Sequence, residues 1–169
     1  MKKFIFLLFV FLLSVQCGYH LRGTGSALPE HIKKINIPMF KNSTTRFELD
    51  LKLTQKVIDE LVTRGKVEIT DDRSSAEAVL TGEIISFPAN PIAFSGEATA
   101  DRYNITIVAK ILLRDILKNK NIFSNPNFVY QEEYEVPEGM DFETVETEAI
   151  DKVAEKFAKT LVITILEGF

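Results

Sequence analysis

The sequence is poor in the residues that build disulfide frameworks and metal centres. Its 169 residues include one Cys, two His and no Trp. One Cys excludes a disulfide framework and a cysteine-based zinc site, and two His offer little to a histidine-rich metal centre. A basic excess is also missing, because the formal net charge is −4. We therefore expect one globular domain with no metal, no bound cofactor and no nucleic-acid partner.

Common catalytic motifs are absent as well. The sequence has no Gly-x-Ser-x-Gly elbow, no P-loop and no His-Glu-x-x-His motif. His20 and His31 have no second ligand type at metal spacing, so we expect surface histidines. Glu132, Glu133 and Glu135 are explained more simply by a charged edge strand than by acid/base catalysis. We expect a protein that is not an enzyme, and an envelope hydrolase is the least favoured alternative.

The apolar residues are concentrated at the N-terminus. Lys2 and Lys3 precede an unbroken apolar run over residues 4–13. A helix of this length reaches only about 15 Å, half of a hydrocarbon core of about 30 Å. A short apolar run behind a positively charged start is typical of an export signal, so we expect residues 1–16 to be a signal peptide.

The single cysteine, Cys17, lies where such a signal is cut. Residues 14–17, Ser-Val-Gln-Cys, resemble a bacterial lipobox, although Gln16 stands where that pattern has a small residue. The resemblance implies that Cys17 carries a diacylglycerol and an N-linked acyl chain such as palmitate. Acyl chains contribute about 0.8 kcal/mol per buried CH₂, so they hold a soluble domain at a membrane. A free thiol or an intermolecular disulfide is the alternative for a lone exported cysteine.

The residue after Cys17 bears on which membrane is chosen. Gly18 stands there, and no Asp resembles an inner-membrane retention signal. By this resemblance we expect a lipid-anchored protein of the outer membrane that faces the periplasm. Residues 17–30 are the expected tether, and residues 31–169 are the expected domain.

Hydrophobic periodicity predicts a strand, a helix, three strands and a second helix. A capping box of Thr45 and Glu48 starts the first helix, and Gly65 caps its end. The apolar stripe of that helix comprises Phe47, Leu51, Thr54, Ile58 and Leu61, widened by Leu53, Val57 and Val62. The other predicted elements are strands within 32–39, 67–87, 98–115 and 128–136 and a helix over 141–166. Prolines at 88 and 91 are expected to end a strand.

This order predicts an α/β fold of the α+β kind. Two helices are expected to pack on one face of a mixed sheet of about four strands, as a two-layer sandwich. The strand 98–115 alternates apolar and polar side chains, so one face of the sheet is core and the other is mostly polar.

The polar face of this strand holds the candidate ligand-binding residues. Arg102, Lys110 and Arg114 share it with Val108 and Leu112, a combination that suits a ligand both anionic and apolar. A solvated sheet face with ordinary charges explains the same residues, and both interpretations stay open. The loop 90–100, with proline and glycine between long strands, is a second candidate element.

Residues 17–23, Cys-Gly-Tyr-His-Leu-Arg-Gly, are similar to the start of the LPS-assembly lipoproteins, the LptE family. The similarity continues through residues 28–29, 35–40, 76–82 and 102–103. It implies two helices on a four-stranded sheet. It also implies a non-catalytic outer-membrane lipoprotein that plugs and helps to assemble the β-barrel LptD and supports insertion of lipopolysaccharide.

The resemblance implies that members of this family contact lipopolysaccharide with basic side chains near the loop before the long strand and near the fourth strand. In this sequence those regions read Phe-Ser-Gly-Glu at 94–97 and Tyr-Gln-Glu-Glu at 130–133. We therefore assign lipopolysaccharide binding to Arg102, Lys110 and Arg114, because phosphates need guanidinium or ammonium donors. The alternative function is a periplasmic auxiliary lipoprotein, an adaptor of an envelope lipid or solute transporter.

Overall fold

The computed structural model describes residues 28–94, 100–137, 140 and 142–168. The predicted signal peptide, Cys17, His20 and residues 17–27 of the predicted tether lie outside the described residues. The expectations for these segments therefore stay predictions.

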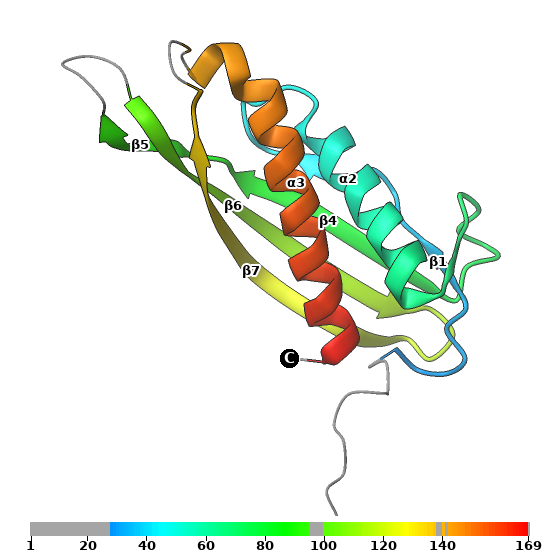
Figure 1. Cartoon of the computed structure of the whole chain (residues 1–169). Coiled ribbons are helices and arrows are strands. Elements are labelled where there is room, and N and C mark those ends of the chain that lie inside the picture. The colour runs from blue at the N-terminus through cyan, green and yellow to red at the C-terminus, as the bar shows by residue number, and fades with distance from the viewer. Residues whose placement is uncertain (1–27, 95–99, 138–139, 141, 169) are drawn as a thin grey trace, which may run out of the picture.

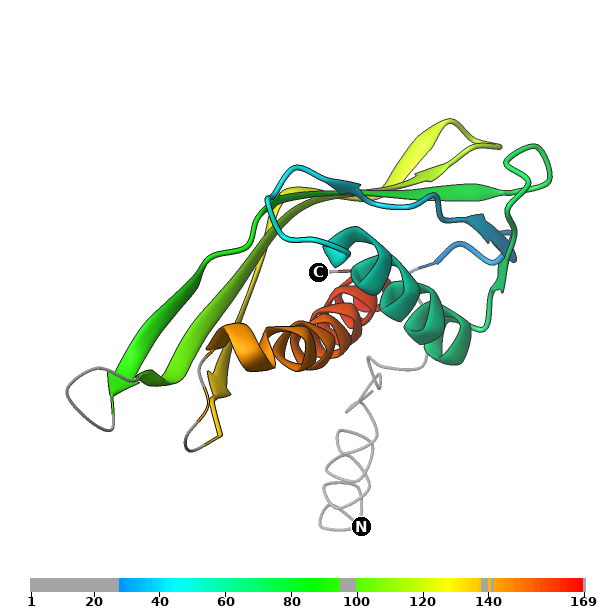
Figure 2. The same ribbon diagram turned by 90° about the horizontal axis from the view of Figure 1, so that it is seen from above.

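A curled, mixed sheet forms one layer of the protein, and two helices form the other (Figures 1 and 2). The helices are α2 (Leu49–Glu60), which continues as the π-helical turn η2 (Leu61–Gly65), and α3 (Phe142–Glu167). Both lie against the same face of the sheet (Figure 2). The predicted class is confirmed. The seven strands are β1 (Lys34–Asn36), β2 (Lys41–Asn42), β3 (Glu68–Ile69), β4 (Ala78–Ser86), β5 (Ala89–Phe94), β6 (Ala100–Asp115) and β7 (Lys120–Glu135).

Strand β6 organises the sheet because three other strands pair with it. Strand β7 is antiparallel to it along almost its whole length, from Arg102–Glu135 to Asp115–Lys120. On the opposite edge of β6, β4 pairs with its second half and β5 with its first half, both antiparallel. Parallel pairs β1–β3, β1–β4 and β2–β4 complete the sheet. Strand β7 is thus an edge strand, as predicted for its three glutamates.

The core lies between the sheet and the helices. Alternate side chains of β6 point into it, and Ile105, Ile107 and Ala109 are fully buried. Phe157 of α3 is also fully buried and packs edge-on against Phe128 of β7, with ring centroids 5.5 Å apart. The predicted alternation of β6 is therefore present, and it leaves one face of the sheet without a helical cover.

The number of strands was predicted wrongly, because the described residues form a sheet of seven strands where about four were expected. Strand β2 has two residues, too short to show a period. Strand β5 contains Pro91, which was expected to end a strand. Because β5 pairs with β6 on one side only, its proline ring costs no ladder hydrogen bond on the open side.

The start of α2 also differs from the prediction. No side chain caps this helix, and the residue before it, Glu48, has a left-handed backbone with φ of 56°. Asn42 organises the preceding turn instead, because its Oδ1 accepts the Thr44 N–H at 3.0 Å and its Nδ2 donates to the Arg46 carbonyl at 2.7 Å. At the other end, the left-handed residue is Lys66, with φ of 53°, and not Gly65.

The helix buries only part of the predicted stripe: four of its eight members, Leu53, Thr54, Val57 and Leu61, are buried. Its buried residues are Leu49, Leu53, Thr54 and Val57, followed by Leu61 of η2. Three members of the predicted stripe are exposed: Phe47, Leu51 and Val62. The apolar residues of this segment surround the helix, so periodicity alone did not select the face that meets α3.

Candidate functional site

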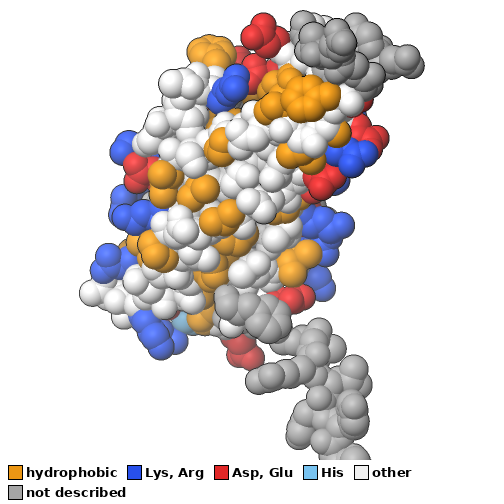
Figure 3. Space-filling model, turned by 90° about the vertical axis from the view of Figure 1, so that its left-hand side faces the viewer, with side chains coloured by type: hydrophobic (Ala, Val, Ile, Leu, Met, Phe, Trp, Pro, Cys, Tyr) orange, Lys and Arg blue, Asp and Glu red, His pale blue; other side chains and the backbone are white. Residues whose placement is uncertain are grey.

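The open face of the sheet, the side away from α2 and α3, is a candidate surface. The structure places Arg102, Lys110 and Arg114 on it, as alternation predicted, with Lys110 and Arg114 exposed and Arg102 half-buried. Figure 3 shows charged side chains along the borders of this face, whereas its centre is apolar or uncharged. We keep the name "open face" for this surface.

The structure does not bring the three basic residues together. They lie along one strand, and with a rise of about 3.3 Å per residue Arg102 is about 26 Å from Lys110, which is about 13 Å from Arg114. A single phosphate group cannot contact all three. Each must therefore be considered with its own neighbours.

Arg102 is engaged by two carboxylates of the facing strand. Its guanidinium lies 3.0 Å from Glu135 Oε1 and 3.6 Å from Glu133 Oε2. The register explains the contact, because Arg102 is directly opposite Glu135 on β7. The pairing offsets the positive charge of Arg102 and leaves this part of the open face net negative.

Lys110 lies beside a smaller polar cluster. Lys41 Nζ is 2.7 Å from Glu83 Oε1, and Ser43 Oγ donates to the same oxygen at 3.0 Å. Hydrogen bonds from Lys41 and Ser43, together with the charges of Lys41 and Lys110, lower the pKa of Glu83. Lys41, Glu83 and Lys110 line a shallow depression of about 280 Å³, and its two ammonium groups and one carboxylate give it a net positive charge.

Arg114 forms a hydrogen bond with the adjacent turn. Its guanidinium donates to Asn119 Oδ1 in the turn that joins β6 to β7. The positive backbone φ of Asn119, 54°, makes this turn tight. Of the three predicted residues, Lys110 is the one that lies in a depression with a second basic group.

An apolar row at the centre of the open face was only partly foreseen. Val108 was predicted there, and in the structure it lies directly opposite Val129 of β7. Ile85 lies at the irregularity of β4 that faces Val108. Ile85 is 45% exposed and Val129 is 47% exposed, so the row Ile85–Val108–Val129 reaches solvent across three strands. Alternation with the core residues Phe128 and Tyr130 is the sequence signal that would have identified Val129.

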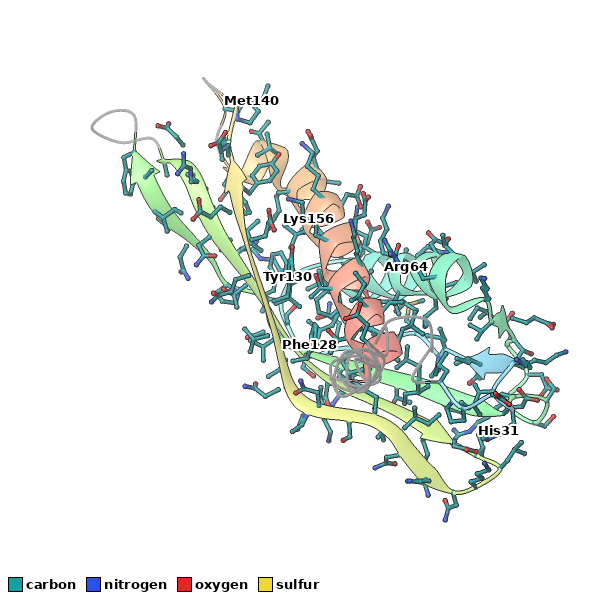
Figure 4. All side chains as sticks on the ribbon, turned by 60° about the horizontal axis from the view of Figure 1, so that its bottom comes forward. His31, Arg64, Phe128, Tyr130, Met140 and Lys156 are labelled. Carbon is teal, nitrogen blue, oxygen red and sulfur yellow. The ribbon has the colours of Figure 1, made fainter. Side chains whose placement is uncertain are left out.

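A second concave site lies between β7 and the middle of α3. It has a volume of about 430 Å³ and is lined by Glu132, Glu133, Tyr134, Glu135, Lys152, Val153, Glu155 and Lys156. Figure 4 shows Tyr130 and Lys156 approaching this gap from strand and helix. Glu132 accepts hydrogen bonds from both, with the Tyr130 hydroxyl at 2.7 Å.

The environment of the second site shifts the pKa values of Glu132 and Tyr130 in opposite directions. Burial opposes the charge of Glu132, but hydrogen bonds from Lys156 and Tyr130 outweigh it and lower the pKa of this carboxyl. Burial and the neighbouring carboxylate raise the pKa of Tyr130. Both shifts move the pKa away from neutral pH, where a general acid or base works best. The contacts of Glu132 with Tyr130 and Lys156 tie β7 to α3.

His31 differs from the surface histidine that was expected. Its Nε2 lies 2.8 Å from Asp115 Oδ2, and the Asp115 side chain is only 3% exposed. A backbone hydrogen bond from Lys118 and the contact with His31 lower the pKa of Asp115 although burial opposes its charge. The pair ties the start of the described chain to the end of β6.

Two searches for other kinds of site were negative within the described ranges. No group of three or more His, Cys, Asp or Glu side chains there is placed to hold a metal ion. In that same part of the chain, no helix has the length and apolar character needed to cross a membrane.

Comparison with known proteins gives a family match and a shared fold. The model of a family described as LptE, lipopolysaccharide-assembly, matches residues 32–165. No curated protein matches the chain. The hypothetical protein CT253 from Chlamydia trachomatis has 11% identity and a TM-score of 0.54, covering 82% of this chain and 97% of that chain. An uncharacterized lipoprotein B from Nitrosomonas europaea has 14% identity and a TM-score of 0.50, with coverage of 89% and 88%. At these identities the solved structures show a common fold only.

Proposed function

The chain belongs to the LptE lipopolysaccharide-assembly family, and from this we propose that it is a non-catalytic lipoprotein of the outer membrane that plugs and helps to assemble the β-barrel LptD. In this role it supports insertion of lipopolysaccharide into the outer membrane. The observation that carries the proposal is the family match over residues 32–165, almost the whole described chain. Attachment to the membrane through acyl chains on Cys17 is part of the proposal.

The open face is the surface proposed to meet the barrel. Its apolar row of Ile85, Val108 and Val129 is exposed to solvent in the isolated chain, and the charges lie towards its borders. A partner that covers the row gains apolar burial, while the border charges select its orientation. Strands β6 and β7 have 16 residues each. At about 3.3 Å per residue such a strand is roughly 50 Å long, enough to pass through a hydrocarbon core of about 30 Å inside a barrel.

Lipopolysaccharide contact is proposed for the basic residues of the open face. Lys110 is the best supported member of the set Arg102, Lys110 and Arg114, because Lys41 lies in the same depression. Ammonium groups on either side of a hydrogen-bonded carboxylate can orient a phosphate, and Val108 and Leu112 lie on the same face for acyl chains. Arg102 contributes less in this proposal because Glu133 and Glu135 already engage it.

Affinity capture from the outer membrane tests the proposed partner. The full-length protein, tagged at its C-terminus, is purified from detergent-solubilised outer membranes, and the largest stoichiometric partner is identified by mass spectrometry. We expect a β-barrel of the LptD type. Recovery of an inner-membrane ATPase complex would favour the adaptor alternative instead, and recovery of the chain alone would contradict the proposal.

Substitution of the predicted lipidation site tests the anchor separately. Cys17→Ala removes the only thiol in the sequence and with it the proposed acyl chains. We expect the variant to move from the membrane pellet to the periplasmic fraction, because no other acyl group holds it. Cys17→Ala that still sediments with membranes to the wild-type extent would reject lipidation at this residue.

A further inference from the structure

The turn between β6 and β7 exposes two apolar side chains at one end of the molecule. Ile116 is 38% exposed and Leu117 is 66% exposed, and Lys118, Asn119 and Lys120 follow them. The lysines and the asparagine are exposed as well. An apolar pair followed by two ammonium groups is a composition that proteins place at the boundary between water and lipid.

Hydrogen bonds hold this turn in one conformation without help from its apolar side chains. The Ile116 N–H donates to the Glu77 carbonyl at 2.9 Å, and the Lys118 N–H donates to Asp115 Oδ1 at 2.9 Å. Arg114 bonds Asn119 across the turn. Ile116 and Leu117 are therefore presented to solvent by a fixed backbone, and little ordering entropy remains to be lost when they bind.

The same end of the molecule holds the start of the described chain. Asp115, the last residue of β6, bonds His31 at 2.8 Å. Glu77 accepts the Lys34 N–H at 2.9 Å, so residues next to His31 are tied to the segment that holds the turn. Figures 1 and 4 show the start of the described chain and His31 beside the β6–β7 turn.

The distance along the sequence to the proposed anchor is short. Cys17 precedes Leu28, the first described residue, by eleven positions. Eleven residues span at most about 40 Å even when fully extended. Leu28 is itself packed in the core. An acylated Cys17 therefore keeps this end of the domain within reach of the membrane surface at all times.

The charges at this end favour a lipid surface over an apolar protein surface. Within the described residues, no carboxylate lies at ion-pair distance from Lys118 or Lys120, whereas Asp115 and Glu77 are engaged by His31 and by backbone N–H groups. The turn therefore presents net positive charge to an approaching surface. Lysine side chains close to the surface are attracted to an anionic leaflet.

The opposite end of β6 offers an internal comparison. Phe94 pairs there with Ala100 and is 61% exposed, similar to Leu117. Its described charged neighbours on β6 and β7 are Asp101, Arg102 and Glu135, and none of these is a lysine. Both ends are apolar, but only the end beside Leu28 combines apolar side chains with unpaired lysines.

We propose that the β6–β7 turn is a second membrane contact, in which Ile116 and Leu117 enter the interfacial region of the leaflet and Lys118 and Lys120 meet lipid phosphates. This inference rests on the proposed anchoring through Cys17. Two attachment points fix an orientation that one flexible tether cannot fix. The open face then stands clear of the lipid and remains accessible to a barrel partner.

A site-specific depth measurement tests the contact. Leu117→Cys is made in the full-length lipidated protein, where the acylated Cys17 leaves the new thiol as the only one to label. A nitroxide label is attached, and the protein is reconstituted in vesicles of phosphatidylethanolamine and phosphatidylglycerol without any barrel. The reference is the same label on a Cys17→Ala variant in detergent-free buffer. Relative to this reference, we expect the collisions of the label with oxygen to rise severalfold in vesicles and its collisions with a water-soluble nickel complex to fall severalfold.

Phe94→Cys is the matched control, because its exposure is similar and it lies at the other end of β6. Its label should remain as accessible to nickel in vesicles as in buffer. Equal nickel access at positions 117 and 94 would overturn the proposal, as would protection of position 117 that appears only when a purified barrel is added. Protein that does not sediment with vesicles at all would show that the anchor has failed, a result distinct from failure to capture a barrel.

Charge substitution adds a second readout. K118S/K120S should reduce the protection of the label at position 117 in anionic vesicles and leave it unchanged in phosphatidylcholine vesicles. Added salt should have the same effect on the unsubstituted turn, because it screens the attraction. Protection that depends on neither the lysines nor the salt would contradict the assigned role of the lysines.

Discussion

The two faces of the sheet differ in how deeply their apolar side chains are buried. The face under α2 and α3 carries Ile105, Ile107 and Ile111, which have almost no exposure. The open face carries Ile85 and Val129, which are about half exposed, and charged residues that pair mostly with each other. Burial of the first set stabilises the fold whether or not a partner is present. The second set gains its burial only when another surface covers it, so substitutions on the two faces should affect different measurements.

The largest effect is expected beneath the helices. Phe157→Ala should lower the free energy of unfolding by about 3–5 kcal/mol, because it leaves a cavity among fully buried side chains such as Phe128. Urea denaturation followed by circular dichroism measures the loss. Phe47→Ala is the matched control, since Phe47 is 85% exposed and its removal should change stability by less than about 0.5 kcal/mol. Equal losses for the two variants would contradict the claim that burial beneath the helices stabilises the fold.

A smaller effect is expected from Asp115 and Glu83, two of the carboxylates whose pKa is lowered. Asp115→Asn should destabilise the protein at neutral pH by about 1–3 kcal/mol, because the buried carboxylate accepts hydrogen bonds from His31 and from the Lys118 N–H. Glu83→Gln should cost less, because Glu83 is partly exposed and its contacts with Lys41 and Ser43 lie on the open face.

The pH dependence of unfolding tests the contribution of the Asp115 carboxylate separately. A carboxylate with a lowered pKa in the folded state stabilises the protein above its unfolded pKa, and that contribution disappears as pH falls through the folded value. The ordinary pKa of an aspartate is 3.8. As the pH is lowered below this value, the urea midpoint of the wild type should therefore decrease more steeply than the urea midpoint of Asp115→Asn. Parallel curves for the two proteins would show that the Asp115 carboxylate is not a source of acid sensitivity.

Substitutions on the open face should change binding of the partner and leave the free energy of unfolding almost unchanged. Val129→Glu places a charge in the apolar row and should abolish capture of the barrel, while the free energy of unfolding changes by less than about 1 kcal/mol. Val62→Glu is the matched control, because Val62 is 49% exposed and Val129 is 47% exposed. Capture that survives Val129→Glu and is lost with Val62→Glu would place the partner on η2 instead.

The smallest effect is expected from the basic residues of the open face. R102S/K110S/R114S should weaken lipopolysaccharide binding severalfold, with Lys110→Ser alone supplying the greater part, because Arg102 and Arg114 are held by Glu135 and Asn119. A control triple of similar charge, K56S/R73S/K159S, lies off this face and should bind normally. If both triples bind lipopolysaccharide like the wild type, the residues are ordinary solvated charges.

Long periodic segments could be predicted from the sequence, and segments set by tertiary contacts could not. The helix predicted over 141–166 is found as α3, and the strand predicted over 98–115 is found as β6, because each repeats its apolar period many times. The buried stripe of α2 and η2 was predicted only in part, because Phe47, Leu51 and Val62 recur at helical spacing although they are exposed. Strand β5 was missed because a proline is compatible with an edge strand.

The candidate surface was predicted in outline for the same reason. Alternation along β6 fixes which residues share a face, so Arg102, Lys110 and Arg114 were placed correctly on the open face. Their partners depend on the register between strands, which one strand's sequence does not contain. The contacts of Arg102 with Glu135 and of Lys41 with Glu83 follow from that register. The importance of Val129 likewise required its position opposite Val108.

Photo-crosslinking in living cells tests most directly whether the open face is the partner surface. A photoreactive amino acid is placed at position 129 in one strain and at position 62 in another, in the full-length protein. The account predicts a crosslink to an LptD-type barrel from position 129 and none from position 62. A barrel crosslink from position 62 with none from position 129 would contradict it.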